Sequence, residues 1–372
     1  MTRHIVEGRA FIEGTLQPAR ITCEESRIVS VDTIAEQSSH QLILPGFIDL
    51  HVHGASGFDF MDASQEAVAA ITSFHARNGT SALAATTLSG SSDNIDRALF
   101  AAARFRAGSD NAEIAALHLE GPYVNAKRSG AQDRASIRPP DASEIERWIE
   151  RAGSLPITMT IAPELDGAEA IIERFRDRII FSIGHTDATY SDTVNAIERG
   201  ATRMTHLFNA MPPLHHRDPG PIAAAAVEPR VTVELIADGV HLHPAVLRIA
   251  AEMFRSRTTL VTDAMRACGM PDGNYALYSY EVTVRDGEAR LPDGTLAGSV
   301  LTMAGAVRNM VELAGLPLEL VVPMATEIPA RVIGIHDRKG KLREGFDADI
   351  VVLSSKMEID RILLRGTEVK LS

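Results

Sequence analysis

The sequence has few cysteines, no long apolar run and no basic cluster, and each absence narrows what the chain can be. Cys23 and Cys268, the only two cysteines in 372 residues, lie far apart and outside any Cys-x-x-Cys spacing. We therefore expect both thiols to be reduced, as in a cytoplasmic protein. No segment approaches the roughly 18 to 20 consecutive apolar residues of a membrane span. The first residues, MTRHIVEGRAFIEG, lack the apolar segment of a secretory signal.

The charge balance is acidic. With 37 lysines and arginines against 49 aspartates and glutamates, the formal net charge is −12 at pH 7. Because no basic block is present to neutralise phosphates, nucleic acid is not expected as a partner. A small anionic substrate is still compatible with this charge, since the local field of a binding site can oppose the charge of the whole molecule.

The sequence does contain a regular alternation of β-rich and helix-like runs between about residues 43 and 315. The β-rich runs predict eight strands, at Ile43–Leu50, Thr80–Thr86, Glu113–Leu119, Ile157–Ile161, Ile179–Ile183, Thr202–Thr205, Val231–Ala237 and Thr258–Val261. Apolar residues three and four apart predict helices between them, for example at Ser64–Asn78, Asp93–Arg106, Ser143–Ala152 and Pro244–Arg255. Eight strands, each followed by a helix, favour an α/β fold, a parallel (β/α)8 TIM-like barrel. An open doubly wound sheet is the alternative, but no Gly-x-Gly-x-x-Gly motif follows the first strand.

The two ends of the chain do not follow this alternation. Residues 1–44 and 335–372 have the pattern of short strands and turns, and chain termini often lie close together. We expect them to form one small β-sandwich domain beside a barrel of residues 45–334. A further β-rich insert near residues 278–296 contains the turn signals Asp286-Gly287 and Asp293-Gly294, and we expect it to lie over the barrel mouth.

The most informative motif is His51-Val52-His53, at the end of the first predicted strand. Residues two apart in a strand point to the same face, so both imidazoles project together from the strand end. Two neutral imidazoles are half of a transition-metal site. Taken alone, the pair is equally well explained as two solvated histidines, because two ligands do not make a site.

Further polar residues follow other predicted strands. Glu120 comes after the third strand, His185 after the fifth, His206 after the sixth and Asp263 after the eighth. In a barrel of this type these strand ends meet at one rim, where the chemistry takes place. Each residue alone has a structural explanation, such as a turn or a helix cap. Together with the two histidines of the first strand, they indicate a metal-dependent active site.

The other histidines are interpreted differently. His118 shares a strand face with Glu120, so it either orients that carboxylate or is an ordinary hydrogen-bonded barrel histidine. Four more are interpreted as structural or solvated: His4, His40, His75 and His336. A surface role is expected for the other three: His215, His216 and His243.

Seven segments carry the candidate residues: PGFIDLHVHG, HLEGPYVN, IGHTDAT, THLFNAM, IADGVHLHP, VTDAM and AGSVLTM. With them the chain resembles the amidohydrolase superfamily and, within it, the N-acetylglucosamine-6-phosphate deacetylases. The tail GKLREGFDADIVVL is similar to the strand that closes the sandwich domain of the superfamily. Many amidohydrolases have a carboxylated lysine after the fourth strand, where this chain has Ile161-Ala162-Pro163-Glu164. That difference argues against hydantoinases and dihydroorotases, and deaminases of the superfamily lack the HLEGP and THLFNAM segments.

The resemblance implies a divalent-metal site with one or two ions of zinc, iron, manganese or cobalt. It implies that Glu120, His185 and His206 hold one ion. A second ion would be held by His51 and His53, with Glu120 bridging the two. The resemblance assigns Asp263, the catalytic residue, as the general base that takes a proton from water and passes it to the leaving amine.

For the substrate, the resemblance implies that Arg217 and His241 bind a sugar phosphate, in some members across a dimer interface, so a homodimer is expected. Asn209 and Ala210 match a loop that contacts the phosphate end. Several relatives have a histidine that contacts the acetyl carbonyl where this chain has Gln132, which donates a hydrogen bond but cannot become cationic. The alternative for Arg217 is an idle surface charge.

The expected reaction is metal-dependent hydrolysis of N-acetyl-D-glucosamine 6-phosphate to D-glucosamine 6-phosphate and acetate, a step of amino-sugar metabolism. The N-acetylgalactosamine 6-phosphate epimer is the alternative substrate, because no residue identified from the sequence decides the orientation of one hydroxyl. A non-catalytic barrel that serves as a scaffold is the more remote alternative. Such a protein would have no reason to keep five metal ligands and the aspartate.

Overall fold

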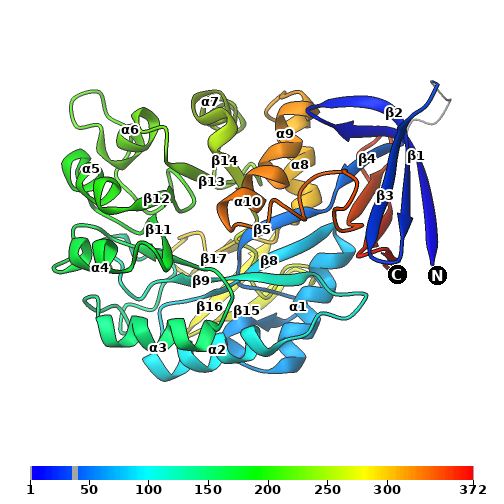
Figure 1. Ribbon diagram of the computed structural model, residues 1–372. Coiled ribbons are helices and arrows are strands. Elements are labelled where there is room, and N and C mark those ends of the chain that lie inside the picture. The colour runs from blue at the N-terminus through cyan, green and yellow to red at the C-terminus, as the bar shows by residue number, and fades with distance from the viewer. Residues whose placement is uncertain (1, 36–40, 372) are drawn as a thin grey trace.

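The computed structural model describes residues 2–35 and 41–371, so the interpretation of His40 lies outside the described residues. Its central element is an eight-stranded parallel barrel (Figure 1). The barrel strands are β5 (Phe47–Val52), β8 (Thr80–Thr87), β9 (Glu113–Glu120), β10 (Ile157–Ile161), β11 (Ile179–Ile183), β12 (Ala201–Met204), β13 (Thr232–Ile236) and β14 (Thr258–Val261). They neighbour one another in chain order, and each neighbouring pair runs parallel. The predicted barrel and its strand order are confirmed.

The first and last strands meet just beyond their C-terminal ends. Val52 and Ala264 form a parallel bridge. The amide of Asp263 donates to the carbonyl of His51, and the amide of His53 donates to the carbonyl of Ala264, both at 2.9 Å. These hydrogen bonds hold the ends of the first and eighth barrel strands together. They thereby bring the His51–His53 pair close to Asp263.

Helices surround the barrel, and several begin at side-chain caps that satisfy free amides of the first turn. The caps include Ser64, Ser91, Asp141 and Thr189. The helices are α1 (Gln65–Arg77), α2 (Ser92–Arg104), α3 (Ala142–Ala152), α4 (Ala168–Phe175), α5 (Tyr190–Arg199), α6 (Gly220–Val227), α7 (Pro244–Phe254), α8 (Met303–Glu312), α9 (Leu318–Ala325) and α10 (Glu327–Val332). Short 3₁₀ helices span Phe60–Asp62, Ala126–Arg128 and Arg255–Arg257. In the part of the chain that the structure describes, no helix has the length and apolarity needed to cross a membrane.

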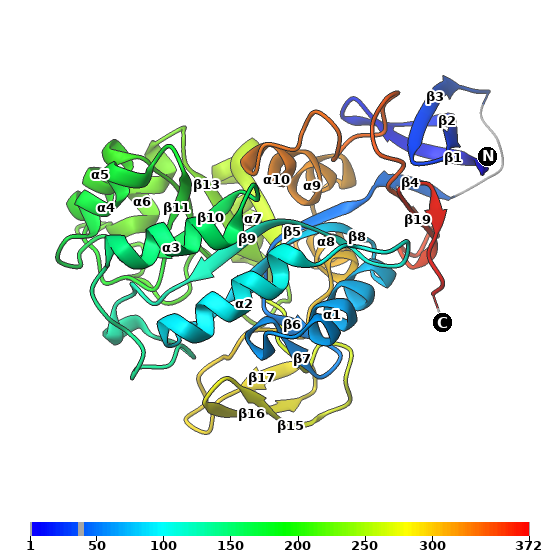
Figure 2. The same cartoon turned by 60° about the horizontal axis from the view of Figure 1, so that its bottom comes forward.

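Both ends of the chain contribute to one seven-stranded sheet, beside which the two termini lie in Figures 1 and 2. Its strands are β1 (Arg3–Ile12), β2 (Thr15–Glu24), β3 (Arg27–Thr33), β4 (Leu42–Pro45), β18 (Ile350–Leu353), β19 (Ile359–Leu364) and β20 (Thr367–Glu368). The sheet is joined in the middle, where β4 pairs with β1 on one side and with β18 on the other. The expectation that the two ends pair with each other is confirmed.

The predicted first strand, Ile43–Leu50, is wrong in one respect: the chain forms two strands there. β4 ends at Pro45 and belongs to the terminal sheet, whereas β5 begins at Phe47 and opens the barrel. Between them, Gly46 packs so closely against the barrel that an added Cβ would lie 2.6 Å from the Cβ of Ser81. The apolar run is continuous because both strands are buried, so hydrophobicity alone does not separate them.

The β-rich insert between the eighth strand and α8 is confirmed, although it begins earlier than predicted. It forms the antiparallel strands β15 (Gly273–Leu277), β16 (Tyr280–Arg285) and β17 (Glu288–Arg290), which project from the barrel in Figure 2. The predicted turn at Asp286-Gly287 connects β16 to β17. A much smaller hairpin, β6 (Gly54–Ala55) and β7 (Phe58–Asp59), follows β5.

Candidate metal centre and active site

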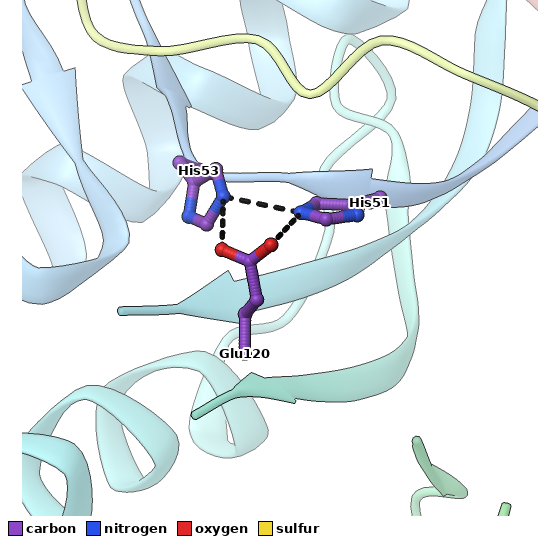
Figure 3. A group of neighbouring side chains, drawn as sticks. All are labelled: His51, His53 and Glu120. Carbon is purple, nitrogen blue, oxygen red and sulfur yellow. Dashed lines mark hydrogen bonds and ion pairs between the residues drawn. The ribbon is translucent and has the colours of Figure 1, made fainter. Parts of the chain in front are cut away.

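The two histidines at the end of β5 face the carboxylate at the end of β9 (Figure 3). The Nε2 atoms of His51 and His53 are 3.2 Å apart. Each lies 3.3 Å from one oxygen of Glu120, His51 from Oε1 and His53 from Oε2. All three residues are buried, at most 3% exposed. The alternation of side chains along a strand thus places both imidazoles on the carboxylate, as the His-x-His motif predicts.

A second group shares the same carboxylate. The Nε2 atoms of His185 and His206 both lie 3.1 Å from Glu120 Oε1, and 3.1 Å from each other. These residues follow β11 and β12, the neighbouring barrel strands. Glu120 therefore joins two groups of three potential metal ligands.

The spacing and electrostatics of these side chains fit divalent ions. Two imidazole nitrogens bound to the same tetrahedral zinc at about 2.0–2.1 Å lie about 3.3 Å apart, close to the separations within each pair. Burial alone would lower the pKa of His53, but hydrogen bonds with Asp263 and Glu120 raise it to about 9. The buried carboxylates thus favour positive charge at this position.

Ring hydrogen bonds on the far side orient two of the ligands. His51 Nδ1 lies 3.0 Å from Glu234 Oε2, and His185 Nδ1 lies 2.8 Å from the carbonyl oxygen of Arg128. A proton held on Nδ1 by each acceptor leaves the lone pair of Nε2 directed at the ligand group.

Asp263 lies next to the first group. Its Oδ1 is 3.2 Å from His53 Nε2 and 3.5 Å from His51 Nε2. Burial would raise the pKa of this carboxyl, but the neighbouring His51 charge and the hydrogen bond with His53 hold it below the ordinary value. An ionised carboxylate at this place can act as a proton acceptor.

Three of these residues have left-handed backbones. φ is +45° at His185, +26° at His206 and +50° at Asp263. Such conformations cost about 1–3 kcal/mol each for residues other than glycine and cluster at functional sites. The backbone at these strand ends is thus strained where the side chains turn towards the centre.

A cavity of about 350 Å³ opens over the cluster. Among the predicted substrate-binding residues, Gln132, Asn209, Ala210 and His241 line it, together with Leu277 and Leu296 from the insert side. The insert therefore covers part of the barrel mouth, as predicted. Arg217 does not line this cavity; it lies on the exposed loop before α6, with Nη1 2.7 Å from His216 Nε2.

The sequence profile of the amidohydrolase family matches residues 42–369. The chain belongs to this family. It is 41% identical to N-acetylglucosamine-6-phosphate deacetylase of Bacillus subtilis, over 87% of this chain and 84% of the relative. It is 34% identical to N-acetylgalactosamine-6-phosphate deacetylase of Escherichia coli O157:H7, over 98% of both chains.

Solved structures agree with this amidohydrolase in fold and length. A mutant N-acetyl-D-glucosamine-6-phosphate deacetylase from Mycobacterium smegmatis, in complex with N-acetyl-D-glucosamine-6-phosphate, superposes with a TM-score of 0.93 over all of both chains, at 35% identity. The enzyme of the same name from Thermotoga maritima gives 0.91 at 31% identity, over 99% of this chain and 100% of the other. The similarity therefore extends over the barrel and both chain ends.

In this amidohydrolase, Gln132 bonds to the metal-ligand group. Its Nε2 donates to Glu120 Oε2 at 2.5 Å, and its Oε1 accepts from the amide of Ser89 at 2.7 Å. Ser89 also packs closely against the backbone at position 121. Only glycine fits there, because a Cβ at Gly121 would lie 2.2 Å from Ser89 Oγ. Gln132 thus braces the carboxylate that both ligand groups share, and its contact with an acetyl carbonyl stays a prediction.

His118 has partners other than Glu120. Its Nδ1 lies 3.3 Å from Thr86 Oγ1 and its Nε2 lies 2.8 Å from Thr160 Oγ1. Both ring nitrogens are thus occupied by threonine hydroxyls, which supports the interpretation as a hydrogen-bonded barrel histidine. Of the peripheral histidines, His75 is buried and its Nε2 lies 3.3 Å from the carbonyl oxygen of Gly54, so it is structural.

Sequence reasoning missed a layer of buried charges beneath the ligands. Asp49 accepts hydrogen bonds from the amides of His51 and Thr262 and from the Thr262 hydroxyl, and burial raises its pKa to about 7. Glu234 and Arg203 form an ion pair of 2.6 Å in the barrel interior. The available signal was a charged residue inside an otherwise apolar strand, which is rarely buried without a partner.

Proposed function

We propose that this amidohydrolase hydrolyses N-acetyl-D-glucosamine 6-phosphate to D-glucosamine 6-phosphate and acetate. One observation carries the proposal: Glu120 joins two buried groups of metal ligands, and Asp263 lies against one of them beneath an open cavity. The relatives support the substrate, since both the Bacillus subtilis and the Mycobacterium smegmatis proteins bear the name of this deacetylase.

The metal ligands would be Glu120, His185 and His206 for one ion, and His51 and His53 for a second, with Glu120 between them. When bound, a divalent ion of zinc, iron, manganese or cobalt supplies Lewis acidity for the acetamide carbonyl and for the attacking water.

The chain's own residues handle the proton. Asp263 takes it from the attacking water as the new carbon–oxygen bond forms. The protonated carboxyl then delivers that proton to the sugar nitrogen as the carbon–nitrogen bond breaks, so that the amine leaves as a neutral group rather than as an anion. Water is thus divided between the two products, acetate and the amino sugar.

The phosphate is proposed to bind at the outer end of the cavity. His241 lines that cavity and its Nδ1 lies 2.6 Å from Asp238 Oδ2; burial would lower its pKa, but this hydrogen bond raises it. A cationic imidazole there suits a phosphate group. Asn209 and Ala210 offer amide groups on the neighbouring loop. Because Arg217 lies away from its own cavity, its proposed phosphate contact requires a second protomer, so we propose a homodimer.

Two features of the whole chain extend the proposal. The terminal sheet is proposed to fold as a small β-sandwich domain, since it has its own apolar core drawn from both chain ends, including Ile21, Ile43 and Ile350. A cytoplasmic location is proposed for the reaction, supported by two free, buried cysteines.

The direct test is acetate release from N-acetylglucosamine 6-phosphate, with N-acetylgalactosamine 6-phosphate measured beside it. We expect kcat/KM for the gluco sugar to exceed that for the galacto sugar at least tenfold. A higher kcat/KM for the galacto sugar would instead favour the alternative substrate, the one in the name of the Escherichia coli relative. Release of acetate from neither sugar, by protein that contains metal, would contradict the proposed function.

A further inference from the structure

We infer that Glu234, held by Arg203, is a positioning residue for the second metal ion, the one assigned to His51 and His53. The inference rests on the proposed function, because it takes these histidines as ligands. Glu234 touches neither the proposed ion nor the substrate cavity. It acts through the far side of one imidazole.

The contacts of Glu234 are specific. It lies on β13, fully buried, beneath the ligands. Its Oε2 is 3.0 Å from His51 Nδ1 and also accepts the backbone amide of His206 at 3.1 Å. Its Oε1 accepts from Arg203 Nη2 at 2.6 Å. One carboxylate therefore holds the ring of a ligand from the first group and the backbone of a ligand from the second.

Arg203 has no evident task other than holding this carboxylate. It is 1% exposed, and its Nε and Nη1 have no hydrogen-bond partner among the described residues. A buried ion pair is often no more stabilising than apolar side chains of similar volume. Stability alone does not explain why the barrel interior holds this pair, whereas control over His51 does.

Among the ligand rings, the Glu234 side chain contacts that of His51, whereas its contact with His206 is to the backbone amide and not to the ring. Within the described chain, His51 is the ligand whose Nδ1 meets a carboxylate, while His185 Nδ1 meets a carbonyl oxygen. The Nδ1 atoms of His53 and His206 have no partner there. An acceptor at Nδ1 keeps the proton off Nε2 and makes the imidazole a stronger ligand. Loss of the acceptor should therefore lower the affinity of His51 and His53 for their ion.

Two double variants separate positioning from packing. Both remove the buried charges, and they differ at position 234: E234Q/R203M keeps a side-chain carbonyl as an acceptor beside an amide NH2, and E234L/R203M has no polar group there. Freed from Arg203, the amide oxygen of the glutamine can face His51 Nδ1 and the His206 amide together. Circular dichroism and thermal unfolding establish that both variants are folded.

The measurement is zinc content per chain at a fixed, buffered free zinc concentration, by inductively coupled plasma mass spectrometry. We expect two ions in the wild type and in E234Q/R203M, and one in E234L/R203M, whose affinity for the second ion should fall about 10- to 100-fold. Adding H53A to E234L/R203M should remove no further zinc, since both changes act on the same ion.

Two outcomes would overturn the inference without touching the reaction. One is a folded E234L/R203M that holds both ions as tightly as the wild type, which would make the pair a packing feature. The other is a wild type that releases acetate but binds a single zinc. Failure of the proposed function would look different, because the wild type would then bind zinc without releasing acetate from either sugar.

Discussion

At the scale of single residues, the neighbours of Asp263 keep its carboxylate charged although it is buried. Hydrogen bonding with His53 and the nearby His51 charge hold its pKa below the ordinary value despite burial. The carboxylate is therefore ionised at neutral pH and ready to accept a proton. Its backbone is left-handed, with φ of +50°, and its side chain lies against His53 and His51.

Asp263→Asn should abolish most turnover, by at least about 100-fold, because the amide cannot accept the proton that the attacking water releases. Metal content should change little, since the five assigned ligands are untouched. Steady-state acetate release and zinc analysis on the same preparation test both statements. Loss of a metal ion from the variant would instead make Asp263 chiefly a ligand.

At the scale of elements, the loop between β12 and α6 joins two parts of the proposed site. His206 lies near its start, in the group of potential metal ligands, and Asn209 and Ala210 follow along the cavity. At its far end, Arg217 is exposed on the molecular surface. One connection thus spans the metal centre and the surface at which a second protomer would contribute its arginine.

Arg217→Ala should raise KM for the phosphosugar about tenfold or more, since a lost charge-assisted contact to phosphate weakens binding. Activity on an unphosphorylated N-acetyl sugar should be unchanged. Arg230→Ala is the matched control, because that exposed arginine pairs with neighbouring Glu228 and does not line the cavity. Equal effects of Arg217→Ala on both substrates would remove it from the phosphate site.

At the scale of the whole molecule, a buried ionic cluster joins the terminal sheet to the barrel. Lys339 is fully buried and pairs with Asp349, with Asp347 at 3.2 Å and with Glu113 at 3.3 Å. Glu113 begins β9, whose other end carries Glu120. The joint and the metal centre thus lie at opposite ends of one strand.

Glu113→Gln should destabilise the protein by about 1–3 kcal/mol at pH 7, because it weakens charged hydrogen bonds at this joint. Burial would raise the pKa of Glu113, but hydrogen bonding from Arg338 and the charge of Lys339 lower it below 4.5. With a depressed folded-state pKa, the stabilisation is complete well above pH 4.5 and disappears as the pH falls through the folded-state pKa.

Urea unfolding of wild type and Glu113→Gln between pH 7 and pH 3 measures this dependence. The difference in unfolding free energy should shrink as the pH falls. A difference that stays constant across the range would show that the carboxylate charge is not its source. Zinc content should be the same in both proteins, since the substitution lies away from the ligands.

The sequence by itself determined the barrel and the places of the candidate ligands along it. The alternation of buried strands and amphipathic helices is local, and residues that follow parallel strands meet at one rim whatever the details of packing. His51, His53, Glu120, His185 and His206 could therefore be identified as candidate ligands from their places at strand ends, and the structure brings them together. The spacing of two along β5 was sufficient to bring its pair of imidazoles together.

Other features were decided only by the tertiary structure. The break at Gly46 depends on contact with Ser81, and the buried Glu234–Arg203 pair depends on two neighbouring strands facing the same interior. The distance of Arg217 from its own cavity depends on the path of a long loop. The spacing of apolar residues along an element predicts which of its faces is buried. It does not predict which residues from distant segments pack against that face, and these features depend on such contacts.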